Sequence, residues 1–202
     1  FMTALLLKHF VAEVRCVNED DRGGGTDGKF KLQHRHWDAA VDIEYDQFNI
    51  EFDTFPYKAE TFDVVYLCEV IEHLAYDPVH AIHEINRVLK LGGSLILSTP
   101  NALRLENLWK LLRGRNFYPP YSGWGVTSRH NREFTRTELC QLLASNGYSV
   151  EIATTHADPG YSYPPFLKRI TQQLDRAHIG TNFLDNIHIR ARKSAAPKYS
   201  YP

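Results

Sequence analysis

The sequence predicts an α/β fold, in which a mostly parallel sheet carries helices on both faces. Two near-continuous apolar runs, "FDVVYLC" at residues 62–68 and "SLILSTP" at residues 94–100, are typical of strands that are covered on both faces. Between them, residues 77–90 place apolar side chains at helical spacing. Strand, helix and strand in this order form a βαβ unit, and such a unit makes its two strands parallel.

The segment before this unit carries shorter patterns. Residues 2–10 predict a helix, residues 12–18 a strand that stops at a polar cluster, and residues 22–29 a glycine-rich loop. Residues 39–51 contain at least one strand, because apolar and polar side chains alternate there. Residues 29–39 fit neither pattern.

Capping residues mark the ends of two helices. Asp77 is expected to cap the helix of the βαβ unit, and the pair Gly92-Gly93 to end it. Thr135 is expected to cap a later helix, with Glu138 three residues on as in a capping box. The other predicted elements are a helix at residues 102–112, a strand at 148–155, a helix at 165–177 and a last strand at 186–193.

The composition is that of an ordinary globular domain. Of the 202 residues, 43% are hydrophobic and 23% are charged, and the formal net charge is −1. We therefore expect one domain over residues 1–193 and a flexible tail at 194–202, with no nucleic acid as partner. Three widely spaced cysteines indicate reduced thiols in the cytoplasm, and no apolar run is long enough to span a membrane. Because Phe1 enters a helical pattern without a cap, we expect the natural start to lie upstream.

A longer pattern runs from Pro56 to Asn101. It comprises a proline–aromatic pair, Phe-Asp before a strand, Glu-His after it, a helix with Arg-Val-Leu-Lys, a Gly-Gly pair and a strand that ends in Thr-Pro-Asn. This order resembles the class I S-adenosylmethionine-dependent methyltransferases of the type 11/23 group. The resemblance implies a Rossmann-like three-layer sandwich with an antiparallel C-terminal strand, S-adenosyl-L-methionine as cofactor, and no metal. The segment "RHNREFT", residues 129–135, resembles a subgroup whose members often lie near glycan or cell-surface biosynthesis.

The chain departs from this family at its beginning. The family's first strand and its glycine-rich turn are absent, although that turn lets the backbone approach the cofactor. The loop "RGGGTDG" does not replace it, because the 36 residues between Gly25 and Phe62 are too few for the elements that normally intervene. On this alignment residues 2–10 are the first helix and residues 12–18 the second strand.

The resemblance places the cofactor site at the ends of three strands. After the second strand an acid accepts hydrogen bonds from the two ribose hydroxyls, a role for which Glu19 is preferred to Asn18. Asn18 and Glu19, like residues 49–51, could instead only end their strands, and Cys68 could instead serve only in packing. The other cofactor candidates are Asn49, Ile50 and Glu51 near the adenine, and Leu67, Cys68 and Glu69 near the sulfonium, where Glu69 stabilises the sulfur or orients the amino group.

Two histidines are candidates for the base that takes the acceptor proton, since imidazole titrates near neutral pH. His73 follows the fourth strand, and its alternative role is to hold a neighbouring loop. His130 lies in the later loop, and its alternative role is in a polar cluster that ties this loop to the next helix. His80 and His83 share a helix face but lack a third metal ligand.

The long loop around His130 carries the candidates for acceptor binding. The planar guanidinium groups of Arg129 and Arg132 suit a phosphate or carboxylate, and Tyr121 and Trp124 suit a lid or a sugar-stacking wall. We therefore expect methyl transfer to an oxygen or nitrogen of a small molecule or glycan. The alternative is a catalytically inactive methyltransferase-like partner subunit, because the glycine turn is missing. A nicotinamide dehydrogenase is disfavoured, since no dehydrogenase motif replaces that turn.

Overall fold

The computed structural model describes residues 13–18, 28–32, 40–118, 129–158, 160, 164–178 and 181–198. The chain divides into two compact units, residues 1–55 and residues 56–202, and each unit is described here by itself. The expected single domain over residues 1–193 stays a prediction.

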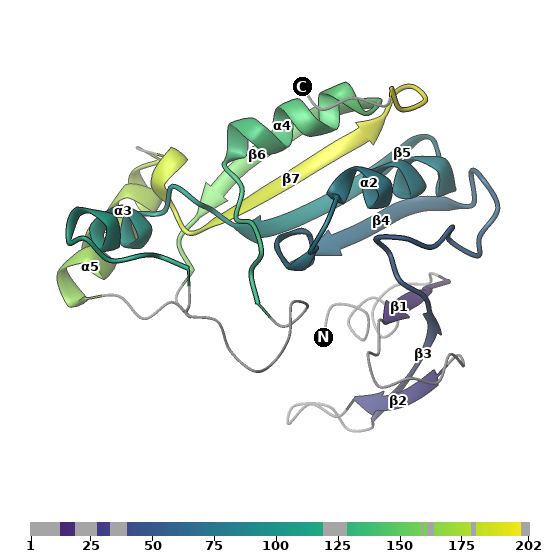
Figure 1. The fold of residues 1–202 in the computed structure, drawn as a ribbon, viewed down its shortest axis with the longest axis horizontal. Helices are drawn as coiled ribbons and strands as arrows, with labels where there is room; N and C mark the ends of the chain where they lie inside the picture. The colour runs from purple at the N-terminus through teal and green to yellow at the C-terminus, as the bar shows by residue number, and fades with distance from the viewer. Residues whose placement is uncertain are drawn as a thin grey trace. The chain divides into compact units, whose positions relative to one another are not determined.

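The first unit contains a three-stranded sheet in the order β1-β3-β2 (Figure 1). The strands are β1 at Cys16–Asn18, β2 at Gly28–Leu32 and β3 at Val41–Gln47. β1 runs parallel to β3, and β2 runs antiparallel to it. β1 and β3 confirm predicted strands, whereas β2 lies mostly in the segment that fitted neither pattern. The predicted helix at residues 2–10 lies outside the described residues.

The second unit contains a four-stranded sheet in the order β4-β5-β7-β6. Its strands are β4 at Phe62–Cys68, β5 at Leu89–Pro100, β6 at Tyr148–His156 and β7 at Asn186–Lys193. β4 and β5 are parallel, as the βαβ unit predicts, and β7 is antiparallel to both of its neighbours. Three strands therefore share one direction and the C-terminal strand opposes them, although two of the three pairings are antiparallel. The α/β class is confirmed.

In the described residues of this unit, four α-helices and two short 3-10 helices connect the strands (Figure 1). All four predicted helices of this unit are confirmed. Their bounds are Pro78–Val88 for α2, Leu105–Leu112 for α3, Arg136–Ser145 for α4 and Pro165–Ala177 for α5, while η1 spans Ile71–His73 and η2 spans Thr181–Phe183.

The helix α2 begins as predicted but ends earlier. Its N-cap Asp77 accepts a hydrogen bond from the backbone N–H of Val79 at 2.8 Å. Its last turn is closed by the segment before β4, because the backbone N–H of Thr61 donates to the Val88 carbonyl at 2.8 Å. The prediction that Gly92-Gly93 ends this helix is therefore wrong, since both glycines lie within β5. A side chain at Gly93 would place its Cβ 2.9 Å from the Lys90 carbonyl oxygen, so close backbone contact requires glycine there.

α2 and α4 lie beside each other on one face of the second sheet (Figure 1). Asn146, which ends α4, accepts a hydrogen bond from Asn86 of α2 through its carbonyl at 3.2 Å. The hydroxyl of Tyr148, which is 3% exposed, donates to the Ile82 carbonyl of α2 at 3.1 Å. The core lies between these helices and the inward residues of the sheet, which are Leu67, Leu95, Leu97, Ile187, Ile189 and Ala191.

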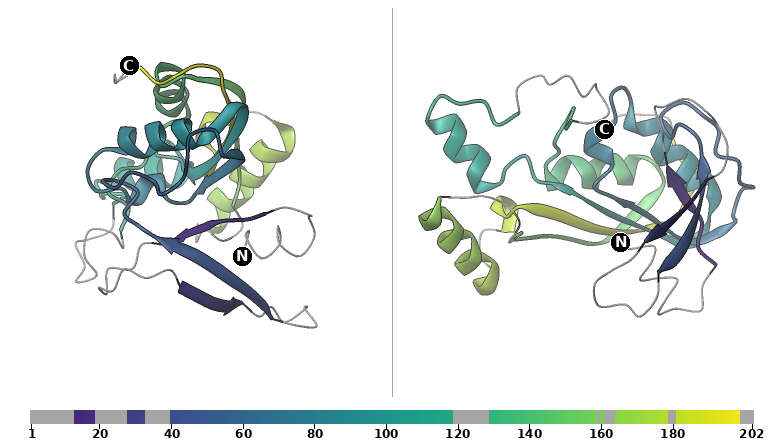
Figure 2. Two further views of the ribbon diagram at one scale, coloured as in Figure 1. Left: turned by 90° about the vertical axis from the view of Figure 1, so that its right-hand side faces the viewer. Right: turned by 90° about the horizontal axis from the view of Figure 1, so that it is seen from below.

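The opposite face of this sheet carries a cross-strand row in which three side chains are hydrophobic and one is an arginine. Tyr66, Ile96, Arg190 and Ile152 are cross-strand neighbours, and Tyr66 and Ile152 are 43% and 44% exposed. α5 lies at the end of this face, where its Asp175 pairs with His156 of β6 at 3.3 Å. At one end of the sheet, α3 and α5 lie near each other (Figure 2). Trp109 of α3 and Phe166 of α5 form an edge-to-face pair there.

The first residues after β7 are bonded to the second unit. Ser194 and Ala195 donate backbone hydrogen bonds to the Gly147 carbonyl at 2.9 and 3.0 Å, so the beginning of the expected tail is attached to the domain. In the part of the chain that the structure describes, no helix combines the length and the apolar character that a membrane crossing requires.

Candidate functional site

The candidate site begins where β4 leaves its sheet. Leu67 is buried and Cys68 half-buried, and Glu69 follows with a φ of 55°, a left-handed conformation that is costly for a residue with a side chain. Ser98 of β5 holds Glu69 twice, because its carbonyl accepts from the Glu69 N–H at 2.9 Å and its hydroxyl donates to Oε1 at 2.7 Å. The carboxylate of a residue with a strained backbone is thus fixed at the C-terminal edge of the two parallel strands.

Glu72, in η1, is a buried carboxylate with only one of its oxygens satisfied. Its side chain is 1% exposed, and Thr99 at the end of β5 donates to Oε2 at 2.8 Å. Oε1 is buried and has no hydrogen-bond partner among the described residues. Burial raises the pKa of Glu72, and the hydrogen bonds that it accepts only partly oppose this rise.

The loop at residues 129–134 is attached to η1 by several hydrogen bonds. The backbone N–H of Asn131 donates to the Glu72 carbonyl at 2.7 Å, and its side-chain amide donates to the His73 carbonyl at 2.7 Å. His73 Nδ1 donates to the Arg129 carbonyl at 3.0 Å, which is the contact that a loop-holding role of His73 requires. The same contacts bring His130 beside His73, with ring centroids 4.9 Å apart and ring planes at 85°.

His130 is supported by a second buried carboxylate, that of Glu133. His130 Nδ1 donates to Glu133 Oε1 at 3.0 Å, and Arg104 donates to both carboxylate oxygens at 2.6 and 3.0 Å. The amide of Asn107 in α3 adds a bond to Oε2 at 2.9 Å. Burial opposes ionisation of Glu133, but these donors outweigh it and lower the pKa of this carboxyl. The hydrogen bond to Glu133 in turn raises the pKa of His130.

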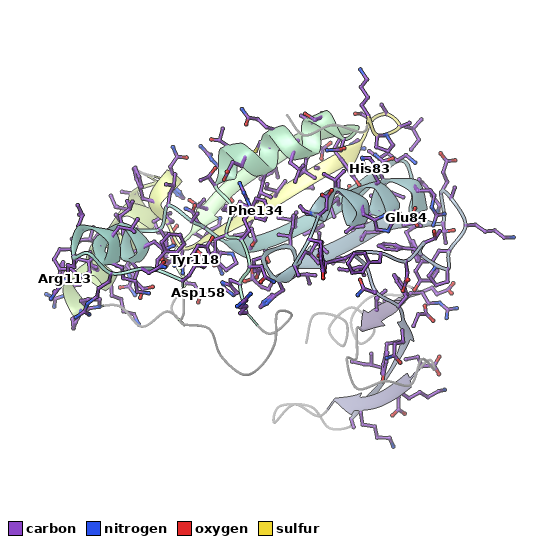
Figure 3. The ribbon with its side chains drawn as sticks, in the orientation of Figure 1. His83, Glu84, Arg113, Tyr118, Phe134 and Asp158 are labelled. Carbon is purple, nitrogen blue, oxygen red and sulfur yellow. The ribbon has the colours of Figure 1, made fainter. Side chains whose placement is uncertain are left out.

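This cluster lies at the C-terminal end of β5. Glu133 is also bonded to the segment after α3, because its backbone N–H donates to the Tyr118 hydroxyl at 3.2 Å. Phe134 bonds to the segment after β5 through the N–H of Ala102, at 2.9 Å (Figure 3 labels Tyr118 and Phe134). The predicted polar cluster around His130 is therefore present, but it ties the loop mainly to α3 rather than to α4.

The predicted acceptor-binding residues are only partly described. Arg129 donates from Nε to the Asn131 side chain at 3.1 Å. Arg132 is paired with Glu138 at 2.9 Å, and its side chain is 63% exposed. Tyr121 and Trp124 lie outside the described residues. The assignment of these four residues to an acceptor stays a prediction.

The cofactor candidates of the first unit belong to a strand end and a turn. Asn18 ends β1, and Glu19 lies outside the described residues. Asn49 accepts from the Glu51 N–H at 2.8 Å, and its own N–H donates to Asp53 at 2.8 Å. Their grouping with Leu67, Cys68 and Glu69 of the second unit stays a prediction.

The sequence did not single out several polar residues of this region. Thr99, Ser98 and Arg104 are recognisable only from their partners, which lie 27 to 29 residues away along the chain. Asp185, before β7, is 0% exposed, and burial raises its pKa to about 6. A buried carboxylate at a strand start has no local pattern, so nothing in the sequence could have indicated it.

Comparisons with known proteins identify the family of this chain. A family model described as "Methyltransferase domain" matches residues 11–152. A Mycolicibacterium smegmatis protein named "probable S-adenosylmethionine-dependent methyltransferase" is 32% identical over 96 residues, which are 48% of this chain and 32% of that protein. The mitochondrial ubiquinone biosynthesis O-methyltransferase of Mus musculus is 31% identical over 142 residues, which are 68% of this chain and 35% of that protein.

A solved S-adenosylmethionine-dependent methyltransferase from Methanosarcina mazei has 18% sequence identity and a TM-score of 0.49, over 75% of this chain and 68% of that one. The chain spans about a third of the length of the curated relatives that it matches. The family match confirms the resemblance that was drawn from the sequence.

Proposed function

Because this chain belongs to the class I methyltransferase family, whose cofactor is S-adenosyl-L-methionine, we propose that it transfers a methyl group to an oxygen or nitrogen of a small molecule or glycan. The observation that carries the proposal is the pairing of His130 with the buried Glu133, at the strand edge where Glu69 is also fixed. In α/β sheets, ligands bind at the carboxyl ends of the strands, and both groups lie there.

The residues at the end of β4 suit this cofactor. Glu69 offers a carboxylate that Ser98 holds at 2.7 Å, and a fixed anion favours a cationic sulfonium or ammonium group. Leu67 and Cys68 offer an apolar and a weakly polar surface beside it. We assign the ribose hydroxyls to Asn18 or Glu19 and the adenine to Asn49, Ile50 and Glu51.

When bound, the cofactor would supply a methyl group on a sulfonium. The acceptor atom would bond to the methyl carbon while the carbon–sulfur bond breaks and sulfur keeps the electron pair. The acceptor would also lose a proton. His130 is our choice for the group that acts on this proton. Its Nδ1–H is committed to Glu133, so Nε2 carries the lone pair and faces away from that bond. The ionised Glu133 stabilises the imidazolium that forms, as in other carboxylate–histidine pairs. His73 is the second candidate for this role.

For the acceptor, the relatives named ubiquinone biosynthesis O-methyltransferases favour a small molecule with a hydroxyl group over a glycan. The side chains that we assign to acceptor binding are those of Arg129, Arg132, Tyr121 and Trp124. The three cysteines are free thiols, which suits the cytoplasm as the compartment.

The test of this proposal is cofactor binding by titration calorimetry. We expect saturable binding of S-adenosyl-L-methionine, and a loss of at least about tenfold in affinity for Glu69→Gln, because the fixed charge is removed. Glu60→Gln is the matched control, since Glu60 shares the left-handed conformation with a φ of 56° and its side chain is 60% exposed. Absence of cofactor binding by a folded chain would favour the inactive partner subunit instead.

A further inference from the structure

We propose that Glu72, His73 and His130 bind one divalent transition-metal ion. One carboxylate oxygen of Glu72 and one ring nitrogen of each histidine lie within 4.8 Å of one another. Glu72 and His73 come from η1 and His130 from the loop at residues 129–134, so the site is assembled by the docking of that loop.

The strongest argument is the unsatisfied oxygen of Glu72. A buried carboxylate oxygen without a partner costs free energy, and native structures rarely keep one without a purpose. Oε1 is such an atom, while Oε2 is occupied by Thr99. The Nε2 of His73 lies 3.9 Å from Oε1, which is beyond hydrogen-bond distance. A metal ion between these atoms would satisfy Oε1.

The two imidazoles are held in the tautomer that a metal requires. A carbonyl oxygen can only accept, so His73 Nδ1 carries the proton that bonds to Arg129, and Nε2 has the lone pair. His130 Nδ1 likewise carries the proton that bonds to the ionised Glu133. Histidines that bind metals commonly donate their other N–H to a backbone carbonyl or a carboxylate, and this site shows one of each.

The frame around the three ligands is fixed, and only small closure is needed. The backbone carbonyls of Glu72 and His73 each accept a hydrogen bond of 2.7 Å from Asn131. Ligands at about 2.1 Å from a tetrahedral ion are about 3.4 Å apart, so the side chains must approach by roughly 1 Å. The two imidazoles are 33% and 31% exposed, which gives an ion access from solvent.

The ligand set determines the class of ion. Two imidazoles and one carboxylate suit Zn²⁺, Mn²⁺, Fe²⁺ or Co²⁺, whereas Mg²⁺ and Ca²⁺ prefer oxygen ligands alone. Three protein ligands leave positions open, as in catalytic sites. For its role in catalysis the inference rests on the proposed function: an acceptor hydroxyl bound to the ion loses its proton more easily, so that the histidines act through the ion instead of taking up the proton. This departs from the metal-free site that the family resemblance implies.

The test is a Co²⁺ titration of chelator-treated, tag-free protein, followed by its visible absorption and by the melting temperature. We expect one equivalent to bind with a dissociation constant in the micromolar range or below, and to raise the melting temperature by mass action. Glu72→Gln, His73→Asn and His130→Asn should each weaken Co²⁺ binding by at least about tenfold. His178→Asn is the control, because His178 is an exposed histidine that ends α5, and it should bind Co²⁺ as the unsubstituted chain does.

Glu72→Gln separates a metal ligand from a merely structural carboxylate. This substitution removes a buried carboxylate whose Oε1 has no hydrogen-bond partner among the described residues. Without metal, the variant should therefore have a melting temperature equal to or above that of the parent. A structural role predicts a lower melting temperature and unchanged Co²⁺ affinity. That result, or absence of saturable Co²⁺ and Zn²⁺ binding by the folded parent, overturns the site. Cofactor binding is measured separately, so loss of one proposal leaves the other standing.

Discussion

The buried Asp185 leads to a prediction about stability and pH. Its side chain is 0% exposed, its Oδ2 accepts one bond from the Asp158 N–H at 2.8 Å, and its Oδ1 has no partner among the described residues. Burial raises its pKa from 3.8 to about 6, a rise that Asp158 and Glu106 add to and that Arg104 opposes. The folded state therefore favours the protonated carboxyl.

The sign of the effect follows from this rise. As pH increases through 3.8, the unfolded chain releases its proton while the folded chain keeps it, so the folded state loses stability until pH exceeds about 6. With one pKa unit worth about 1.4 kcal/mol, the loss is about 1.6 kcal/mol at pH 5 and about 3 kcal/mol at pH 8. Asp185→Asn removes this titration. We expect the variant to gain about 1.4 kcal/mol more, relative to its parent, at pH 8 than at pH 5.

The assay is thermal unfolding of parent and variant at both pH values. For a chain of this size the difference corresponds to about 3–6 °C in melting temperature between the two pH values. Asp63→Asn is the control, since the Asp63 side chain is 78% exposed and pairs with an exposed lysine. An Asp185→Asn effect that is equal at pH 5 and pH 8, or smaller at pH 8, would refute the reasoning.

Three further substitutions test the packing around the site, each by urea unfolding. Glu133→Gln removes the carboxylate to which Arg104 donates two hydrogen bonds, while Glu106 stays at 3.7 Å, and should cost about 3 kcal/mol; a cost below about 1 kcal/mol would contradict a desolvated pair. Thr135→Ala removes the capping box of α4 and should cost about 1 kcal/mol, whereas no change would mean that this box contributes nothing. Tyr148→Phe removes the hydroxyl that bonds to α2 and should cost about 1 kcal/mol; a stabilised variant would speak against that bond.

The sequence predicted the elements whose cause is local. The capping box of Thr135 and Glu138 forms as predicted, because its bonds join residues three positions apart. The start of α2 at Asp77 is likewise a local event. The end of α2 was missed, because the segment that closes it lies far upstream in the chain. β2 was missed because its five residues, "GKFKL", are too few for the alternation of Phe30 and Leu32 with two lysines to predict a strand, and its pairing with β3 involves residues outside this segment.

The candidate site shows the same division. His73 and His130 could be selected because histidine is chemically versatile, and their spacing along the chain gave no reason to group them. The contact depends on Asn131, whose backbone and side chain both bond to η1, and a sequence does not reveal such docking. Arg104 has no distinctive neighbours in the sequence, so its pairing with Glu133 could be found only in three dimensions.

The position of β7 has a consequence for how the domain folds. β7 is the last of the described strands of this sheet along the chain, yet it lies between β5 and β6 and pairs with both of them. During synthesis β5 and β6 therefore have no direct partner in each other, and their facing edges stay open until residues 186–193 have left the ribosome. Such long-range pairing slows folding, and open strand edges invite association. Chains released before this segment should accumulate as aggregates, whereas addition of the segment should close the sheet in one late, cooperative step.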